Sequence, residues 1–197
     1  MKINNNIVAL RERLRDIIQH ISPLPEQELT EFLQLFQIEK FPKKSVIISP
    51  GTTNNRLYFI IDGVVRIYYV AEGKEITYDF KEENSFFVNG YNLYTGLPNF
   101  DFHIAVSNVV TLVADYNKVE ELSEKYHTIE HMGRKVVERY YAEFLIANYN
   151  KLFLSADERY DVFMKERPLL INRVPLRHIA SYLGLTPETL SRLRARK

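Results

Sequence analysis

A block of short β-rich segments between two helical regions restricts the fold more than any other feature of this sequence. From about residue 37 to residue 115, runs of β-branched and aromatic residues are separated by turn residues. The clearest runs are SVIISPG (45–51), RLYFIIDGVVRIYYV (56–70), EITYDF (75–80) and HIAVSNVVTLVADY (103–116). Asp62-Gly63 lies between two apolar runs and predicts a β-hairpin, and Glu72-Gly73-Lys74 predicts a second turn. Strands at this spacing predict a small antiparallel barrel or roll.

Helical segments precede and follow this block. Two amphipathic helices are predicted before it, the first ending at the proline-containing segment 22–25. Their apolar faces are Ile7, Leu10, Leu14, Ile17 and Ile21, and then Leu29, Phe32, Leu33 and Phe36. Apolar residues spaced three and four apart predict one long helix over residues 117 to about 150, and a further helix is expected at 156–166.

The predicted long helix has a wide apolar stripe. Tyr140, Tyr141, Phe144 and Tyr149 make the stripe too wide for a single packing partner. The helix could pack only on its own roll, but this width favours a homodimer in which two long helices pair.

Residues 175–197 predict two short helices that are separated by Gly184. The first buries a stripe of Leu176, Ile179, Ala180 and Leu183, and the second directs Leu190 and Leu193 inward. Thr186 suits the N-cap of the second helix, and Pro187 suits its first position. Glu188, Arg192 and Arg196 share the outer face. This layout is typical of a DNA-binding helix-turn-helix, and the alternative is a helical hairpin with a solvated basic face.

Charge is unevenly distributed along the chain. Residues 165–197 contain eight basic and two acidic residues, a net charge of +6, while the whole chain carries +1 and the first 164 residues therefore about −5. This asymmetry indicates a nucleic-acid-binding tail attached to a body with another role.

Composition excludes several classes of protein. The sequence has 197 residues, of which 46% are hydrophobic, so it can bury a sizeable core. It contains no cysteine, which excludes disulfides, cysteine-ligated zinc and iron–sulfur clusters and predicts a cytoplasmic protein. No apolar run reaches the roughly 18 residues of a transmembrane helix.

The predicted fold class is α+β. Residues 1–116 are expected to form an antiparallel β-roll of jelly-roll or double-stranded β-helix type with its leading helices, residues 117–150 a long dimerisation helix, and residues 151–197 a helix-turn-helix domain.

Two motifs together resemble one family. Gly51, the run Asn55–Ile67, Gly73, Phe80 and the run Asn84–Phe87 resemble the cyclic-nucleotide-binding roll. The run from Ile179 to Leu193 resembles the helix-turn-helix of the CRP/FNR transcription regulators. The resemblance covers essentially the whole chain, and it implies a homodimer that binds a two-fold-symmetric operator and responds to an effector in the roll.

The resemblance also implies the DNA contacts. Glu188 and Arg192 match the positions that read base edges, because Arg can donate to guanine and Glu can accept from cytosine. Pro187 stands where some members carry another base-reading arginine. The full set of expected DNA-binding residues is Arg177, Thr186, Glu188, Thr189, Arg192, Arg194, Arg196 and Lys197.

The roll departs from the cyclic-nucleotide binders. Family members hold the ribose with a Gly-Glu pair and the cyclic phosphate with Arg-Ser, but no arginine or lysine occurs here between Lys81 and Lys118. A buried phosphodiester without a cationic partner is costly, and Asp101 would repel it. Responsiveness to cyclic AMP or GMP is therefore not expected. An apolar or aromatic effector and a roll filled by its own side chains remain open alternatives. The candidate pocket residues are Phe87, Asn89, Tyr91, Asn99, Phe100 and Phe102.

No catalytic residue, metal site or cofactor is predicted. His127 and His131 lie four residues apart, but no third ligand accompanies them, and exposed polar residues are the better interpretation. His103 is expected to be a satisfied or exposed strand residue. Two rival functions stay open: a cyclic-nucleotide or other small-molecule sensor with an atypical phosphate-binding cassette, and a β-roll metalloenzyme.

Overall fold

The computed structural model describes residues 6–196 and places two four-stranded antiparallel sheets against a set of helices. The first sheet has the strand order β1-β8-β3-β6 and the second the order β2-β7-β4-β5. The strands are β1 (Gln37–Phe41), β2 (Val46–Ile48), β3 (Arg56–Asp62), β4 (Val65–Ala71), β5 (Lys74–Lys81), β6 (Phe86–Phe87), β7 (Asp101–Ala105) and β8 (Val109–Asp115). The two sheets face each other as a roll, which confirms the predicted antiparallel α+β class.

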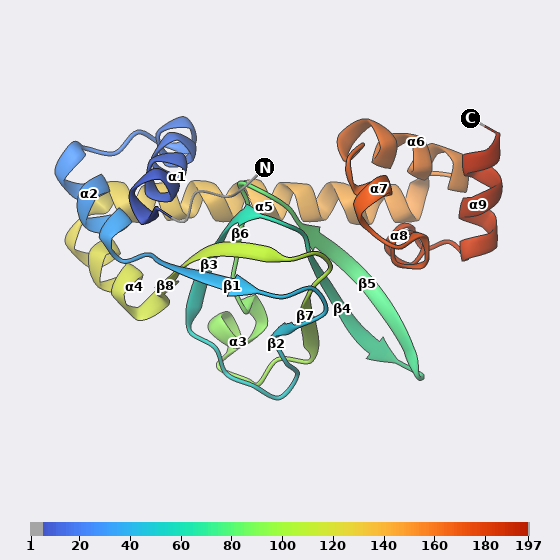
Figure 1. The fold of residues 1–197 in the computed structure, drawn as a ribbon, viewed down its shortest axis with the longest axis horizontal. Helices are drawn as coiled ribbons and strands as arrows, with labels where there is room; N and C mark the ends of the chain where they lie inside the picture. The colour runs from blue at the N-terminus through green and yellow to red at the C-terminus, as the bar shows by residue number, and fades with distance from the viewer. Residues whose placement is uncertain (1–5, 197) are drawn as a thin grey trace.

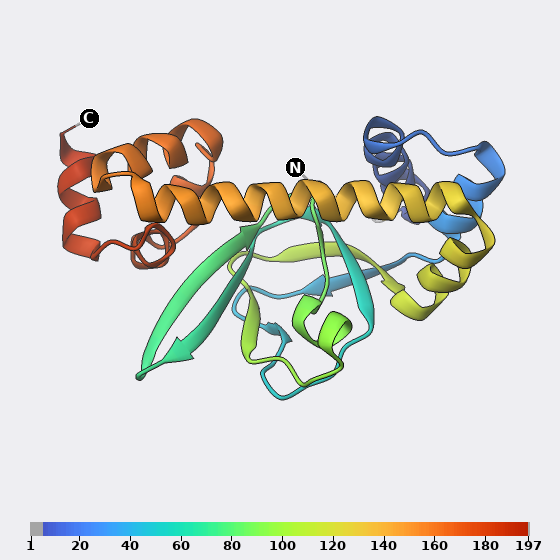
Figure 2. The ribbon, with the colours of Figure 1, turned by 180° about the vertical axis from the view of Figure 1, so that it is seen from behind.

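The helices lie around one long rod (Figures 1 and 2). They are α1 (Ile7–Ile21), α2 (Glu26–Gln34), α3 (Gly90–Thr95), α4 (Tyr116–Lys125), α5 (His127–Phe153), α6 (Ala156–Glu166), α7 (Leu170–Arg173), α8 (Leu176–Leu183) and α9 (Pro187–Ala195). The rod is α5, which runs across the molecule with α1, α2 and α4 at one end and α6 to α9 at the other, while the roll lies along one side of it.

Three groups of buried side chains hold these parts together. The first lies between the leading helices, the start of α5 and the first sheet, and it includes Leu14, Phe32 and Met132. The second lies inside the roll around Tyr58 and Phe87. The third fills the C-terminal helices and extends onto the roll through Val64 and Phe80. Burial of Phe80 among the C-terminal helices therefore joins them to β5.

The turn at Asp62-Gly63 does not form the predicted hairpin. β3 pairs with β8 and β6, whereas β4 pairs with β5 and β7, so the chain crosses from one sheet to the other at this turn. Gly63 has a φ of 102° and its backbone N–H donates to the Glu83 carboxylate at 2.8 Å. Long-range pairing decided the partner of each strand, and the local turn signal cannot report it. The second predicted turn is a true hairpin, in which Glu72 and Gly73 both have positive φ between β4 and β5.

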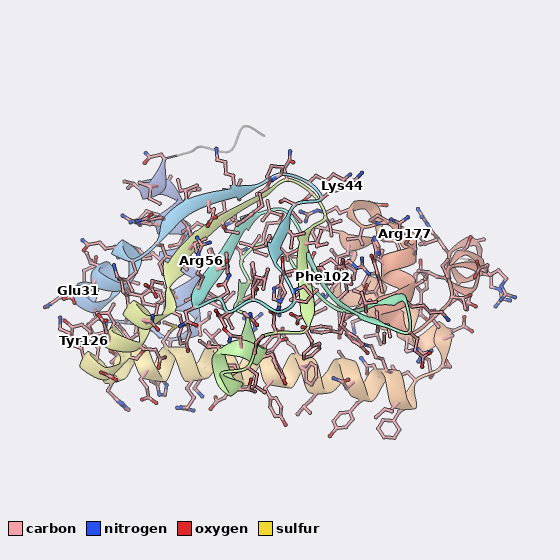
Figure 3. The ribbon with its side chains drawn as sticks, turned by 90° about the horizontal axis from the view of Figure 1, so that it is seen from below. Glu31, Lys44, Arg56, Phe102, Tyr126 and Arg177 are labelled. Atoms are coloured by element: carbon pink, nitrogen blue, oxygen red, sulfur yellow. The ribbon has the colours of Figure 1, made fainter. Side chains whose placement is uncertain are left out.

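The predicted single helix over 117–150 is also wrong in one respect. The helix is broken at Tyr126, which has an extended backbone with φ −129° and ψ 105°. The Tyr126 hydroxyl donates to Glu31 at 2.9 Å, and Lys125 forms an ion pair with the same carboxylate at 2.8 Å (Figure 3). These contacts fix the break against α2, and as a result α4 and α5 run in different directions. The apolar residues keep a helical spacing on both sides of Tyr126, so the sequence does not reveal the break.

Four short elements give little signal in the sequence, and the four-residue helix α7 is one of them. β1 is the edge strand of its sheet and is only half-buried. Its sequence, QIEKF, therefore contains polar residues and lacks the apolar run that would predict a strand. β6 has two residues, and α3 has six, between an Asn89 N-cap and a left-handed Gly96.

The turn at Gly63 provides a test of the sheet crossing. A Cβ at this position would lie 2.4 Å from the Asn108 carbonyl oxygen, and φ is positive as well. We expect Gly63→Ala to lower the free energy of unfolding by about 3 kcal/mol. Gly73→Ala is the matched control, because Gly73 also has positive φ but no atom within 4 Å, and it should cost about 1 kcal/mol. Urea unfolding measures both, and equal losses would contradict the close approach.

Candidate nucleic-acid interface

The C-terminal helix pair is built as the sequence predicts. Ile179, Ala180 and Leu183 on α8 are buried, and α8 ends at Gly184, which is left-handed with a φ of 66°. The Leu185 N–H then donates to the Ala180 carbonyl at 2.9 Å, which closes the turn. Gly184 supplies a backbone conformation that a residue with a Cβ adopts only with strain.

α9 starts at a satisfied N-cap. The Thr186 hydroxyl accepts from the Thr189 N–H at 3.2 Å, and Pro187 occupies the first turn, as expected. Leu190 and Leu193 are buried against the rest of the unit. These two anchors fix which side of α9 faces the core and which side is free.

The free side of α9 carries the expected DNA-binding residues. Glu188, Arg192, Arg194 and Arg196 are all exposed, Thr186 is exposed and Thr189 is half-buried. Arg177 is exposed on the neighbouring helix α8 (Figure 3). Lys197, the last expected contact, lies outside the described residues.

Glu188 is held in its charged form. The effects of its own backbone N–H and of the Thr186 hydroxyl lower the pKa of Glu188, and nearby Arg192 lowers it further. At neutral pH the face therefore presents one carboxylate acceptor in the first turn and several guanidinium donors further along α9.

The helix pair rests on the roll through the outer edge of β5. β5 is the last strand of its sheet, so its outer edge has backbone groups without a strand partner. The Ser181 hydroxyl on α8 accepts from the Thr77 N–H at 2.9 Å and donates to the Glu75 carbonyl at 3.2 Å. One serine side chain thus takes the place of a neighbouring strand, which covers an edge that would otherwise be open.

Charged pairs strengthen this contact. Arg173 on α7 binds Glu83 through both guanidinium nitrogens, one of them at 2.8 Å. The same carboxylate accepts from Gly63, so the pair links the C-terminal unit to the crossing between the two sheets. Burial acts to raise the pKa of Glu83, but Arg173 and the backbone N–H groups outweigh it and lower the pKa. Arg167 donates to the Phe80 carbonyl at 3.0 Å.

His178 on α8 is held neutral beside two arginines. Burial and the positive charges of Arg66 and Arg177 lower its pKa to about 4. Arg66 is buried and is held by Thr77, at 2.8 Å, and by Glu75, at 2.6 Å. An uncharged His178 adds no further repulsion to this cationic group at neutral pH.

The interior of the roll is occupied by a network around Asp101. This residue is 4% exposed, and its carboxylate accepts from Tyr78 and, at 2.9 Å, from Asn99, with the His103 Nε2 at 3.4 Å. Burial alone would raise the pKa of Asp101, but these donors lower it to about 2. The charge expected to oppose a phosphate is therefore present and buried in the roll.

The six candidate pocket residues are divided between the interior of the roll and its surface. Phe87 is buried and stacks on Tyr58 with ring centroids 4.5 Å apart, and Phe102 stacks on Tyr68 at 5.0 Å. Asn89 and Asn99 are buried, and Asn89 caps α3.

The other two candidates, Tyr91 and Phe100, are exposed and contact each other edge to face at 4.9 Å. The nearby hollow beside α3 is lined instead by residues such as Asn54, Asn92 and Tyr116. Of the six candidates, three are therefore buried, Phe102 is half-buried, and Tyr91 and Phe100 lie at the surface.

Several residues that build the site gave little signal in the sequence. Tyr78 has no opposite residue on β4, because the register passes from Asp79 opposite Ile67 to Thr77 opposite Tyr68. This bulge leaves Tyr78 free to reach Asp101, but a bulge is not visible in residue spacing. Ser181 is equally hidden, because its role depends on an edge strand about a hundred residues earlier.

The histidines show no arrangement for a metal. His127 contacts Glu130 at 3.0 Å, and His131 contacts Arg134 at 3.0 Å, both near the start of α5. His103 is buried, and its Nδ1 has no hydrogen-bond partner. Within residues 6–196 there is no cluster of three or more side chains suited to a metal ion. No helix in the same part of the chain is both long and apolar enough to cross a membrane.

Comparisons with known proteins identify the architecture. Residues 38–126 match the family model of the cyclic nucleotide-binding domain. The structure is similar to FixK2 of Bradyrhizobium japonicum, with a TM-score of 0.66 and 20% identity over 82% of this chain and 83% of that one. It is similar to the regulator CLP of Xanthomonas campestris, with a TM-score of 0.69 and 15% identity over 87% and 91% of the two chains.

A third similar structure, from Eubacterium rectale, is described as a transcriptional regulator of the crp/fnr family. Its TM-score is 0.68, with 13% identity over 88% of this chain and 83% of that one. The chain has the CRP/FNR fold. No curated protein matches the sequence.

The CRP/FNR fold confirms the resemblance expected from the two motifs, and at identities of 13 to 20% the likeness is one of fold. The match to the cyclic nucleotide-binding domain covers the roll from β1 to Tyr126. Within this CRP/FNR fold, the roll buries a hydrogen-bonded network around the Asp101 carboxylate.

The network at Asp101 predicts a dependence of stability on pH. Its pKa is about 2 in the folded protein and lies below the usual 3.8, so the ionised form contributes stability above pH 4 that is lost as the pH falls towards 2. Asp101→Asn should therefore lower the free energy of unfolding by about 2 kcal/mol at pH 7. The difference from wild type should shrink between pH 4 and pH 2. Exposed Asp16 provides the control, because Asp16→Asn should change the unfolding free energy little at either pH.

Proposed function

We propose that this protein is a homodimeric, sequence-specific DNA-binding transcription regulator with a regulatory rather than a catalytic role. The observation that carries the proposal is the exposed outer face of α9, where Glu188 and Arg192 stand one turn apart on a helix anchored by Leu190 and Leu193. The second helix of a helix-turn-helix enters the major groove and presents such side chains to base edges. Arg194 and Arg196 are suited to contact phosphates, which add affinity without sequence preference.

The proposed dimer forms through α5. Val137, Tyr141, Phe144 and Leu152 follow one face of this helix and are 45–74% exposed. Apolar residues also occupy neighbouring faces, with Tyr149 54% and Phe153 77% exposed. A helix with so much uncovered apolar surface requires a partner, and a second copy of α5 supplies a matching stripe. Two parallel rods of this kind would hold two helix-turn-helix units at the same end of the dimer and at a fixed separation.

The roll is proposed not to respond to cyclic AMP or GMP. Asp101 is buried and ionised in its interior, and Lys81, the last cation before the cation-free segment, is paired with Asp79 at 2.8 Å. A cyclic phosphate would enter a negative site with no positive partner. A sensor with an atypical cassette is the second candidate, and it is favoured by the match of residues 38–126 to the cyclic nucleotide-binding domain. Calorimetric titration with cyclic AMP and cyclic GMP separates the two, because measurable tight binding would favour the sensor.

The direct test of DNA binding is a selection from random duplex DNA with the purified protein and no added ligand. The proposal predicts an enriched palindrome whose half-sites are separated by about one helical turn, roughly 10–11 bp from centre to centre. A library without enrichment, or an enriched site without two-fold symmetry, would contradict the proposed dimeric regulator.

Substitutions on α9 should separate base reading from phosphate contact. We expect Glu188→Ala and Arg192→Ala each to weaken binding to the selected site by about 1–3 kcal/mol, with little change on random DNA. Arg194→Ala is the comparison variant, because it should weaken both DNAs alike and reduce the salt dependence. Fluorescence anisotropy against both duplexes measures these effects. If Arg192→Ala weakened binding to the selected site and to random DNA equally, Arg192 would not be a base-reading residue.

The α5 stripe should control the oligomeric state. Tyr141→Glu places a charge in the proposed helix pair and is expected to convert the dimer to a monomer at micromolar concentration. Arg139→Glu serves as the matched control, because Arg139 lies on the opposite side of α5 with its side chain 69% exposed. Sedimentation velocity distinguishes the states. A Tyr141→Glu protein that stays dimeric would show that copies associate through another surface.

A further inference from the structure

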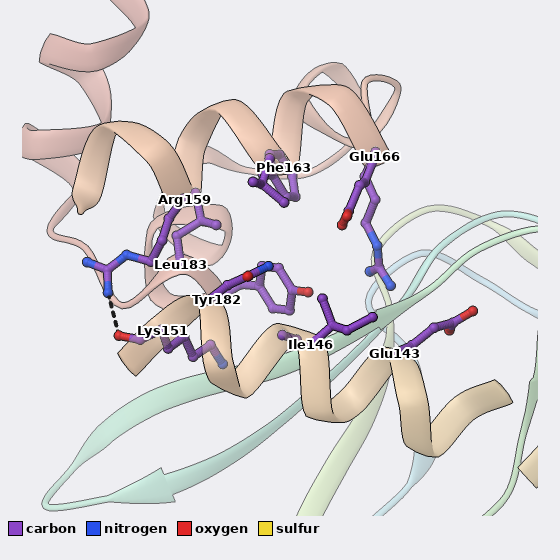
Figure 4. A pocket seen from close by; sticks show the side chains of 12 residues that line it. Glu143, Ile146, Lys151, Arg159, Phe163, Glu166, Tyr182 and Leu183 are labelled. Atoms are coloured by element: carbon purple, nitrogen blue, oxygen red, sulfur yellow. Dashed lines mark hydrogen bonds between the residues drawn. The ribbon is translucent and has the colours of Figure 1, made fainter. Parts of the chain in front are cut away.

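A cavity separates the end of α5 from the C-terminal unit. Its volume is about 290 Å³, and its walls come from α5, α6 and α8 (Figure 4). α6 lies over the end of α5, with Ile146 and Lys151 on one side of the opening and Phe163 on the other. The cavity is separate from the roll interior and from the outer face of α9.

Of the three cations that line this cavity, Lys151 and Arg159 form no ion pair within residues 6–196, whereas Arg167 is paired with Asp79. The Lys151 ammonium is half-buried, and its close contact is the ring of Tyr182, with its nitrogen 5.2 Å from the ring centroid. Arg159 donates one N–H to the Lys151 carbonyl at 3.0 Å, while its Nε is buried without a hydrogen-bond partner in the described chain. Burial lowers the pKa of Lys151, and the positive charge of Arg159 lowers it further, against the opposing effect of Asp79. Both positive charges would be stabilised by an anion placed between α5 and α6.

The middle of the cavity is apolar and aromatic. Phe163 is buried, and its ring centroid lies 6.1 Å from that of Tyr182. Ile146 projects from α5 toward the same space (Figure 4). Glu143 and Glu166 lie at the end of the cavity away from Lys151 (Figure 4). Arg167 also lines the cavity, but it is paired with Asp79 at 3.7 Å, so an anion would be attracted most strongly to Lys151 and Arg159.

The residues of α5 that line the cavity are different from those of the face proposed for dimerisation. Its α5 wall includes Glu143, Ala147 and Lys151, which recur every four residues along one side of the helix. Val137, Tyr141 and Phe144 follow a neighbouring side. A molecule in the cavity can therefore be present together with a second copy of α5.

The geometry points to a binding site for a small organic anion with a flat apolar body in this cavity, its acidic group beside Lys151 and Arg159 and its ring between Ile146, Phe163 and Tyr182. The volume is at the lower limit of small-molecule pockets and suits a single ring. Such a ligand would join the end of α5 to α6 and α8, and so fix the C-terminal unit relative to the long helix. This site goes beyond the proposed DNA binding, and its occupancy can be measured without DNA.

The test uses benzoate as the probe, with benzyl alcohol as the same ring without a negative charge. Isothermal titration calorimetry on the full chain should detect benzoate binding and no binding of benzyl alcohol. At about ten times the dissociation constant, benzoate should raise the melting temperature by about 3 °C. Lys151→Met should weaken benzoate binding at least tenfold, whereas Lys135→Met, which removes an exposed ammonium from the same helix, should leave the affinity unchanged.

A second variant tests the cavity without removing the positive charge of Lys151. Ala147→Phe fills the cavity from α5 while it leaves Lys151 and Arg159 in place, and it should abolish benzoate binding. Circular dichroism establishes that each variant is folded before titration. The proposal is overturned if benzoate gives no binding heat with the wild-type protein. It is equally overturned if Lys151→Met and Ala147→Phe, both folded, bind benzoate with wild-type affinity. Neither result bears on DNA binding by α9, which the duplex selection measures separately.

Discussion

The contact between α8 and the free edge of β5 sets the position of everything C-terminal to the long helix. A strand edge carries unpaired backbone groups, and the Ser181 hydroxyl satisfies two of them, the Thr77 N–H and the Glu75 carbonyl. Phe80 adds a buried apolar contact, and Arg173 with Glu83 adds a paired charge at the neighbouring crossing between the sheets. Since α8 and α9 pack on each other through shared buried residues, the orientation of the outer face of α9 follows from this one contact.

β5 also connects the C-terminal unit to the interior of the roll. Along a regular strand, alternate side chains face opposite sides, but the bulge at Tyr78 interrupts that alternation. Tyr78 consequently reaches Asp101, while Phe80, two residues later, is buried among the C-terminal helices. A change in the roll that moved Asp101 or Tyr78 would therefore act on the strand that carries α8. This arrangement gives the roll a physical connection to the C-terminal helices through β5.

Successive parts of the long helix α5 make different contacts. Its first turns are buried against the leading helices through Ile129 and Met132. Its later turns expose Tyr141, Phe144 and Leu152, and its end forms one wall of the cavity beside α6. One rod thus supports the roll, exposes the surface proposed to pair with a second copy and meets the C-terminal helices. The proposed anion site lies where the end of α5 meets α6 and α8.

The sequence alone determined the types and the order of the longer elements. The 3.6-residue spacing of Leu176, Ile179 and Leu183, the turn at Gly184 and the Thr186 cap are local signals, and the helix pair formed as they predict. Tertiary structure alone decided the crossing at Gly63, the break at Tyr126, the bulge at Tyr78 and the docking of Ser181. Each of these depends on a partner far away in the chain, such as Glu83, Glu31, Asp101 or Thr77. Residue spacing encodes which face of an element is apolar, but the choice of distant partners is made only when the sheets and helices pack.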